Sequence, residues 1–388
     1  MLQWSVITLL CVAVVMVNSA SMSMGSDPVS LKALLLGRPT IYAALAIAVM
    51  WFTSHLDIRK AYSARGVANP VIWLLILAIG LCVVALLPTP ISATINGSRR
   101  WLFLGPRSWG LTFQPSELAK WSLAIALAWW CARHAGSMRR FWAGLVPALL
   151  ITAIVCGLII TQDLGTAALI GAVALVVLLA GGSRWWHIGA MVLPAVGAVA
   201  AMIAISPYRV KRLLAFLDPF ADPQGIGYHP IQSMVAFAHG ATPWGLGSGP
   251  QNLGGYLPAD TTDFLFAVIC EELGLAGAAM VIGLYLVLLW TAISIVRDCR
   301  HPFGRLLGFA VLLTIGLQAV MNIAVVTVMV PTKGIALPFL SSGGTGWVMC
   351  AASVGLLAAI DRVNQVESLE PVIEPPPVVS VSASTVAG

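Results

Sequence analysis

The sequence contains few charged residues and many apolar ones. Only 9% of its 388 residues are Asp, Glu, Lys or Arg, whereas 59% are hydrophobic. A soluble domain carries about 25% charged residues. The composition therefore excludes an ordinary soluble globule and indicates an integral membrane protein with several spans.

Sequence signatures of common cofactor sites are also missing. No Cys-x-x-Cys pair occurs among the seven cysteines, and His229 and His239 have no third ligand near them in the sequence. These absences argue against a zinc site and against a disulfide framework. No P-loop or Rossmann fingerprint follows any strand-like segment. We therefore expect no metal centre, no nucleotide site and no nucleic-acid partner.

What the sequence does contain is a series of ten apolar runs, which predicts an all-α membrane protein with ten transmembrane helices. No Lys or Arg precedes the first run, unlike in a signal peptide, so we expect this run to be retained. Residues 1–361 would form one membrane domain, and the Pro-, Val- and Ser-rich segment 362–388 would be a disordered tail. The runs lie near residues 4–22, 40–55, 70–87, 115–131, 142–160, 165–180, 187–206, 264–293, 306–330 and 344–361.

The distribution of Lys and Arg predicts the orientation of the chain. Short loops rich in these cations face the cytoplasm, which places both termini inside. The cytoplasmic cations are Arg59, Lys60, Arg65, Arg133, Arg139, Arg140, Arg184, Arg297, Arg300, Arg305 and Arg362. The cations on the opposite side are Lys32, Arg38, Arg99, Arg100, Arg107, Arg209, Lys211, Arg212 and Lys333. So much positive charge outside indicates an anionic ligand on the outer face.

Three loops on the predicted outer side are long, covering residues 88–115, 207–262 and 331–344. The largest lies between the seventh and eighth runs. It contains the basic amphipathic segment 208–214, which is typical of a helix at the membrane interface. The third loop is too rich in Pro and Gly for a regular element.

Asp263 follows the Gly-rich end of the largest loop and opens the eighth apolar run. One interpretation is structural, because an acid in the first turn is stabilised by the helix dipole, and Asp260 or Thr261 can cap the helix. The other is a general base at the outer membrane surface. The dipole would lower the pKa of this carboxyl group, and partial burial would raise it.

Glu271 and Glu272 lie about 12–14 Å further along the same helix. They point about 100° apart, so one partner cannot serve both. We expect each to pair with a polar group on another span, because an isolated acid in a membrane helix is costly.

Glu117 and Lys120 share one face of the fourth span, either as an intrahelical ion pair or as ligand-facing groups. Asp163 opens the sixth span, where it could equally be a cap. Arg99, Arg100 and Trp101 are the best candidates for phosphate binding and ring stacking. Further candidates for phosphate binding or for contact with anionic lipid headgroups are Arg209, Lys211 and Arg212.

Five motifs occur in an order that resembles the FtsW/RodA/SpoVE family, also called SEDS proteins. The resemblance covers about residues 4–362. The motifs are Asn96-Gly97-Ser98-Arg99-Arg100-Trp101; Gln114-Pro115-Ser116-Glu117-Leu118 with Lys120; Asp163-Leu164-Gly165-Thr166; Leu257-Pro258 through Thr262-Asp263-Phe264 to Glu271-Glu272-Leu273-Gly274; and Pro331-Thr332-Lys333-Gly334 through Leu337-Pro338-Phe339-Leu340-Ser341 to Gly343-Gly344.

Details of these motifs distinguish the branches of the family. The segments 331–334 and 245–247 resemble the division branch, FtsW, more than the elongation branch, RodA. Ser342 stands where the family usually has Tyr, and Gln162 stands where it usually has Pro. We therefore do not expect Ser342 or Gln162 to be functional.

The resemblance implies a peptidoglycan glycosyltransferase of the bacterial inner membrane. Such an enzyme polymerises lipid II on the outer face, here at the division septum. Its substrates would be lipid II and an undecaprenyl-linked glycan chain. Its protein partners would be a class B penicillin-binding protein, which is a transpeptidase, and other divisome proteins.

The resemblance also implies roles for individual residues. Asp263 would deprotonate the acceptor 4-hydroxyl in an inverting transfer with undecaprenyl pyrophosphate as the leaving group. A pyrophosphate needs cations or a divalent ion such as Mg or Mn, but no protonating acid, and we expect no tightly bound cofactor. The residues expected to bind substrate are Arg99, Arg100, Trp101, Glu117, Lys120, Arg212, Lys333 and Ser341.

Two other functions would use the same lipid. A lipid II flippase predicts polar residues along a path to the cytoplasmic side, whereas here the ionisable residues gather at the outer ends of spans, apart from Glu271 and Glu272. A non-catalytic divisome scaffold would recruit the transpeptidase without chemistry, and no sequence feature marks its contact helices.

Overall fold

The structure is a computed structural model that describes residues 1–21, 31–64, 66–95, 98–106, 111–242, 245–254, 256–257, 261–342 and 344–369. Parts of the sequence motifs, at positions 96–97, 258–260 and 343, lie outside the described residues. The same holds for Arg65, Arg107 and most of the predicted tail.

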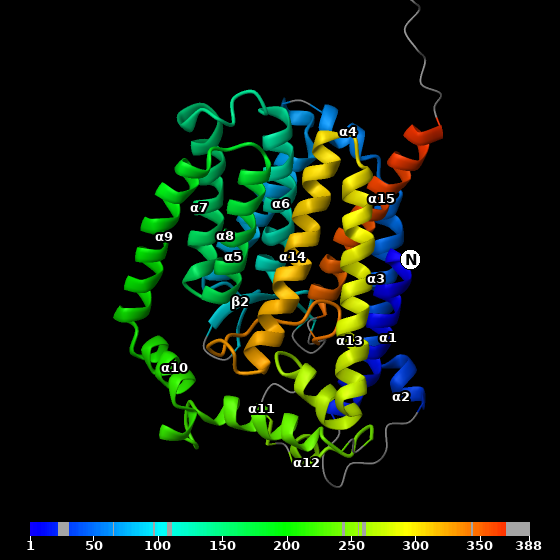
Figure 1. Cartoon of the computed structure of the whole chain (residues 1–388), viewed down its shortest axis with the longest axis vertical. Coiled ribbons are helices and arrows are strands. Elements are labelled where there is room, and N and C mark those ends of the chain that lie inside the picture. The colour runs from blue at the N-terminus through cyan, green and yellow to red at the C-terminus, as the bar shows by residue number, and fades with distance from the viewer. Residues whose placement is uncertain are drawn as a thin grey trace, which may run out of the picture.

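The described chain is predominantly helical and forms an elongated bundle (Figure 1). A helix lies at each of the apolar runs. These helices are α1 (Leu2–Ala20), α3 (Arg38–Ser54), α5 (Pro70–Leu86), α6 (Pro115–Arg133), α7 (Val146–Ile160), α8 (Leu164–Ala180), α9 (Trp185–Ile205), α13 (Leu265–Asp298), α14 (Pro302–Val326) and α15 (Thr345–Leu369). Among the described helices, 6 are long and apolar enough to cross a membrane, while α5 and α8 are apolar but shorter. The chain is therefore an all-α membrane protein.

The helix boundaries follow from local chemistry. Pro70 and Pro115 stand in the first turns of α5 and α6, where the missing N–H of proline removes no helical hydrogen bond. The side chain of Asn69 caps α5 by accepting from the backbone N–H of Val71. Helix α15 continues to Leu369, so the predicted start of the tail after residue 361 is too early.

Short elements gather at one end of the bundle, the lower end in Figure 1, which we call the sheet end. An antiparallel sheet forms there in the order β1-β2-β3, with Leu102 opposite Phe113. The sequence did not predict this sheet. The short elements at this end are α2 (Leu31–Leu36), β1 (Ser92–Ile95), β2 (Ser98–Phe103), β3 (Thr112–Phe113), α10 (Pro207–Leu217), α11 (Tyr228–His239) and α12 (Pro250–Leu253) (Figure 1). Helix α4 (Ile58–Ser63) lies at the opposite, upper end of the bundle in Figure 1.

The other two predicted loops behave differently from each other. The described residues of 207–262 contain α10, α11, α12 and a 3-10 helix at Pro219–Ala221. The basic amphipathic segment lies in α10 and is helical, as predicted. The described residues of 331–344 form no helix or strand, also as predicted.

The bundle has two apolar cores that meet along α6 and α14. One core joins α1, α3, α13, α14 and α15, and the other joins α5, α6, α7 and α8. Helix α9 stands apart at the left edge of Figure 1, and Ile188 is its one buried residue.

Helix α13 is broken within the motif that carries Glu271 and Glu272. Gly274 has φ 63° and ψ −155°, a backbone conformation that only glycine adopts readily. The first segment of the helix is buried, whereas Leu275, just after the break, is 84% exposed. The carbonyl of Glu272 that the break leaves without a helical partner accepts a hydrogen bond from the N–H of Gly245 at 2.9 Å. A short buried helix therefore precedes the lipid-facing part of α13.

Candidate functional site

Asp263 lies in the turn just before α13, at the sheet end of the bundle. The residue at the helix cap is Phe264, with no side-chain cap hydrogen bond. Within the described part of the chain, no side chain or N–H donates to the Asp263 carboxylate. The geometry therefore does not make this aspartate a helix cap, and its partly buried oxygens are available to a ligand.

The electrostatic surroundings of Asp263 suit a proton acceptor. Burial raises the pKa of Asp263 to about 6, while the charges of Arg100 and Arg212 lower it and that of Asp163 raises it. Burial thus outweighs the two cations, and the net shift of the pKa is upward. A carboxyl group with a pKa near the working pH is well matched to general base catalysis.

The backbone around Asp263 is fixed by α14. The side-chain amide of Asn322 donates to the carbonyl of Asp263 at 2.9 Å and to the carbonyl of Ile335 at 2.7 Å. A methyl group at Gly334 would lie 3.1 Å from Oδ2 of Asp263, so the loop passes close to the carboxylate. The next residue back along the loop is Lys333, which is partly buried. Asn322 therefore joins the turn of Asp263 to the loop that carries Lys333.

Strand β2 brings Arg100 to the start of α8. Arg100 Nη1 lies 2.7 Å from Oδ2 of Asp163, and Oδ1 of Asp163 accepts from the backbone N–H of Thr166 at 2.9 Å. Asp163 is therefore both a helix cap and an ion-pair partner. Nε of Arg100 is buried and has no hydrogen-bond partner among the described residues.

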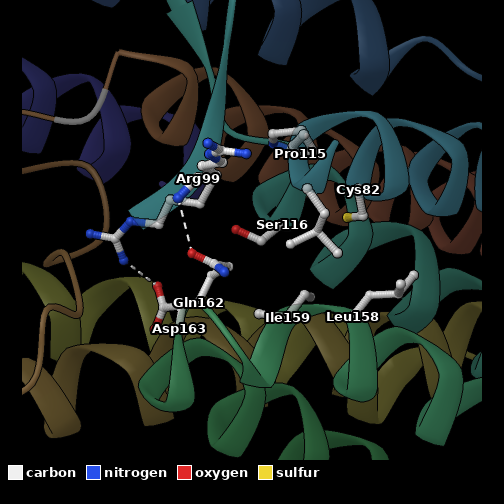
Figure 2. A pocket seen from close by; sticks show the side chains of 11 residues that line it. Cys82, Arg99, Pro115, Ser116, Leu158, Ile159, Gln162 and Asp163 are labelled. Atoms are coloured by element: carbon white, nitrogen blue, oxygen red, sulfur yellow. Dashed lines mark hydrogen bonds and ion pairs between the residues drawn. The ribbon is translucent and has the colours of Figure 1, made fainter. Parts of the chain in front are cut away.

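Arg99 and Gln162 meet across the same junction, as Figure 2 shows. Oε1 of Gln162 accepts from the backbone N–H of Arg99 at 2.9 Å. Arg99 is exposed and Trp101 is half-buried. Next to them lies a small, partly open hollow between the ends of α5, α6 and α7. Gln162 thus has a structural contact at the site, which we did not predict from the sequence.

Glu117 and Lys120 form the predicted ion pair inside the bundle, with Nζ of Lys120 and Oε2 of Glu117 2.8 Å apart. Nζ of Lys120 also donates to Oε1 of Gln318 at 2.8 Å, and the amide of Gln318 donates to the carbonyl of Ala336. Lys120 is only 3% exposed. These groups therefore support the 331–344 loop from below, separately from the Arg100–Asp163 pair.

Ser341 is buried and helps to shape the same loop. Its hydroxyl accepts from the N–H of Leu337 at 2.7 Å, and its carbonyl accepts from the indole of Trp347 at 2.7 Å. Ser341, Glu117 and Gln318 line a cavity of about 330 Å³ beneath the loop. The structure thus places Ser341 beside Glu117 and not beside Arg99.

The basic residues of α10 have separate roles. Arg212 acts electrostatically on Asp263 and also on His229, whose pKa is lowered by burial and by this cation. Arg209 donates to the carbonyls of Ile160 and Met202, each at 3.4 Å. Arg209 therefore fastens α10 to the ends of α7 and α9, and Arg212 is the cation of this helix that belongs to the site.

Glu271 and Glu272 have different partners, as their angular separation predicted. The hydroxyl of Ser19 donates to Oε2 of Glu272 at 2.6 Å, which ties α13 to α1. Oε1 of Glu271 accepts from the N–H of Gln251 at 2.9 Å and lies 3.3 Å from Nδ1 of His239. Both glutamates are 0% exposed. They hold α1, α11 and α12 around the short helix that follows Asp263.

Sequence reasoning did not select Asn322 or Gln318. The only signal was their spacing of four residues in an otherwise apolar run, which places both amides on one helix face. Their contacts with the backbone of the 331–344 loop depend on tertiary structure and leave no trace in the sequence.

Comparisons with known proteins place this geometry in context. The family model described as "Cell cycle protein", which covers FtsW, RodA and SpoVE, matches residues 1–366. A protein of Geobacter sp. (strain M18), named "Probable peptidoglycan glycosyltransferase FtsW", is 35% identical over 355 residues, covering 90% of this chain and 93% of the relative. A protein of the same name from Nitrosococcus halophilus (strain Nc4) is 36% identical over 366 residues and covers 91% of each chain.

Solved structures share the fold. One, described as "Structural coordination of polymerization and crosslinking by a peptidoglycan synthase complex", has a TM-score of 0.70 and 28% identity, covering 93% of this chain and 98% of that chain. The rod shape determining protein RodA of Thermus thermophilus has a TM-score of 0.63 and 25% identity, covering 93% of this chain and 95% of its own.

Proposed function

The chain belongs to the FtsW/RodA/SpoVE family and is a peptidoglycan glycosyltransferase, and we propose that it polymerises lipid II for septal wall synthesis. The single observation that carries the proposal is the Asp263 carboxylate. It is partly buried, accepts no hydrogen bond within the described structure, has a pKa of about 6, and lies in the field of Arg100 and Arg212.

The proposal includes a membrane topology. The ten helices at the apolar runs, including the shorter ones, would each cross the inner membrane. Both termini would lie in the cytoplasm, and the sheet end with the segment 207–262 would face outward. The site would then open where lipid II displays its sugars.

In the proposed reaction, Asp263 accepts the proton of the 4-hydroxyl on the acceptor's N-acetylglucosamine. The freed oxygen forms a bond to the anomeric carbon of the lipid-linked donor, on the face opposite the pyrophosphate. The bond from that carbon to the pyrophosphate breaks, the electron pair leaves with the undecaprenyl pyrophosphate, and the configuration inverts. One carboxylate suffices because the pyrophosphate leaves without being protonated.

The cations of the sheet end would hold the substrate phosphates. Arg99, Arg100 and Arg212 are the strongest candidates because Arg99 is exposed and the other two act on Asp263. Lys333 lies next to Gly334 on the loop that approaches the carboxylate. Lys120 already pairs with Glu117 and Gln318, so we assign it a supporting role.

A divalent ion such as Mg or Mn would accompany the pyrophosphate. Within the described residues, no group of three or more His, Cys, Asp or Glu side chains is placed to hold a metal. Both oxygens of Asp163 already accept hydrogen bonds. Of the two described carboxylates that lie near Arg100, Asp263 is therefore the available one. Mg is commonly bound through one or two carboxylates together with substrate phosphates. This donor set fits an ion delivered with the substrate, which would offset charge on the leaving group.

The proposed protein partner is a class B penicillin-binding protein within the divisome. The structural neighbour described as a peptidoglycan synthase complex supports this partnership, because that complex couples polymerisation to crosslinking. The curated relatives named FtsW support the septal role.

The geometry favours surface chemistry over lipid flipping. A small cavity deeper in the bundle is lined by Lys120 and Thr314, and its remaining lining residues are apolar. Carrying a charged headgroup through such a cavity would be costly. A scaffold role would leave the raised pKa of Asp263 without a purpose.

The experiment that tests the proposal uses purified chain in proteoliposomes with lipid II, with and without its transpeptidase. We expect glycan polymer from the complex and no movement of fluorescent lipid II between leaflets. Flipping without polymer would establish the carrier function instead. Absence of both, with the transpeptidase bound, would leave only the scaffold.

A further inference from the structure

The hollow beneath β2 differs from the Asp263 side of the site in its chemistry. Its walls are apolar, with Ala85 and Leu86 from α5 and Leu158 and Ile159 from α7, while Arg99 and Arg100 form its rim. Figure 2 shows Arg99 on the side opposite Leu158 and Ile159. A hollow with an apolar floor and a cationic rim suits an amphiphile that has a phosphate on an apolar chain.

This hollow, which we call the groove, is accessible from the side of the bundle. Leu86 and Leu158 are partly exposed, and they lie on two neighbouring apolar helices. On α7, one turn before Leu158, Ile154 is 45% exposed, so this helix face is turned toward the membrane. A lipid chain could therefore enter between α5 and α7 without crossing the protein.

The rim contains guanidinium nitrogens that lack ion-pair or hydrogen-bond partners among the described residues. Within the described residues, the guanidinium of Arg99 forms no ion pair. The contact of Arg99 with Gln162 is made by its backbone N–H. Nε of Arg100 is buried without a partner. A buried donor without a partner costs about 1–3 kcal/mol, and more when it is charged. A phosphate oxygen in the groove would supply the missing acceptor.

This inference rests on the proposed function, in which the enzyme binds a donor lipid and an acceptor lipid. The position of the groove indicates that it binds the donor. The anomeric carbon of the donor carries the pyrophosphate directly, whereas the acceptor's phosphates lie a disaccharide away from its reacting hydroxyl. Arg100 and Asp163 both line the groove, where Nη1 of Arg100 lies 2.7 Å from Oδ2 of Asp163, and the charges of both residues act on Asp263. The phosphates bound there are therefore close to the reaction centre, as those of the donor must be.

We propose that the groove between α5 and α7 beneath β2 is the leaving-group site, which binds the pyrophosphate and first isoprene units of the donor lipid. Arg99 and Arg100 contact the phosphates, and Leu86 and Leu158 contact the isoprene units. Gln162 is a positioning residue, because its hydrogen bond fixes the backbone of Arg99 above the groove.

The test measures binding of undecaprenyl phosphate to the complete complex by native mass spectrometry, together with inhibition of polymerisation by this lipid. Leu158→Trp fills the groove, and Ile154→Trp makes the same change one turn away on the exposed face. We expect Leu158→Trp to weaken binding and raise the inhibitory concentration about tenfold, because the indole would occupy the space of the isoprene units. Ile154→Trp should leave both values within about twofold of wild type.

Arg99→Ala changes an exposed side chain and provides the test if Leu158→Trp does not fold. It should weaken binding similarly, and Arg99→Lys should restore part of it. Equal binding of undecaprenyl phosphate to wild type, Arg99→Ala and the folded groove variant would overturn the inference. So would equal competition by phosphatidylglycerol, which would show a general site for anionic lipids. A wild-type complex that binds the lipid at the groove but makes no polymer would instead contradict the proposed function.

Discussion

Asp263 has an environment that links its protonation to catalysis in a measurable way. Burial raises the pKa of Asp263 to about 6, and a general base acts only in its ionised form. We expect the initial polymerisation rate at lipid II concentrations well below KM, which reports kcat/KM, to fall about tenfold for each pH unit below about 6 and to level off above about 7. The rate should be measured from acidic to neutral pH. If it does not fall below this pKa, the assignment of Asp263 as the base is contradicted.

The residues around Asp263 show what a sequence can reveal about a site. The charged members, Arg100 and Asp163, stood out because charge is rare in this chain, and the structure brings both near Asp263. Gln162 and Asn322 were not selected. Amides are compatible with many environments, and their importance here comes from backbone groups that approach from other elements. Their proximity depends on the folded structure alone.

Helix α14 acts on the site through its polar face. Asn322 holds the carbonyls of Asp263 and Ile335, so Asn322→Leu would release the turn and the loop together. We expect kcat to fall about tenfold with a smaller change in KM, because misplacement of a base affects the transition state more than binding.

Thr314→Val is a matched control on the same helix. It removes a buried hydroxyl that bonds only to the carbonyl of Ala310, one turn back. Both variants should fold, and steady-state kinetics on lipid II separates them. Equal losses of kcat would show that α14 contributes only general stability, contrary to the positioning role of Asn322.

The break in α13 makes a prediction at the scale of the element. Gly274 has φ 63°, so Gly274→Ala forces a side chain into a conformation that costs about 1–3 kcal/mol. Gly283→Ala lies in the regular part of the same helix, with open space around its Cβ position, and should be neutral or slightly stabilising. Thermal unfolding in detergent should show a lower midpoint for Gly274→Ala alone. Equal midpoints would mean that the break is not required.

Local patterns predicted the long helices well and the sheet end poorly. Apolar runs identify helices because lipid requires every backbone group to bond within its own helix. The small sheet depends on pairing between segments such as Ser92–Ile95 and Ser98–Phe103, which are short and lack a clear apolar alternation. The break at Gly274 was also missed, since glycine alone does not end a run that remains apolar on both sides.

At the scale of the whole molecule, four of the five sequence motifs converge on Asp263 although they are far apart in the chain. The described parts of the motifs supply Arg100 from β2, Asp163 from the start of α8, Asp263 from the turn before α13, and Gly334 from the loop before α15. The motif with Glu117 lies beneath this group, on α6 between the two cores. The sequence shows the order of the motifs along the chain. Their proximity in space results from the packing of the two cores against each other.

The central claim is that Asp263 is the base of a lipid-linked glycosyl transfer. The most direct test compares wild type with Asp263→Asn, each purified with the transpeptidase and supplied with lipid II. The amide keeps the size of the side chain but cannot accept the proton, so we predict that polymer disappears while insertion, folding and partner binding persist. Polymer made by Asp263→Asn at the wild-type rate would contradict the account.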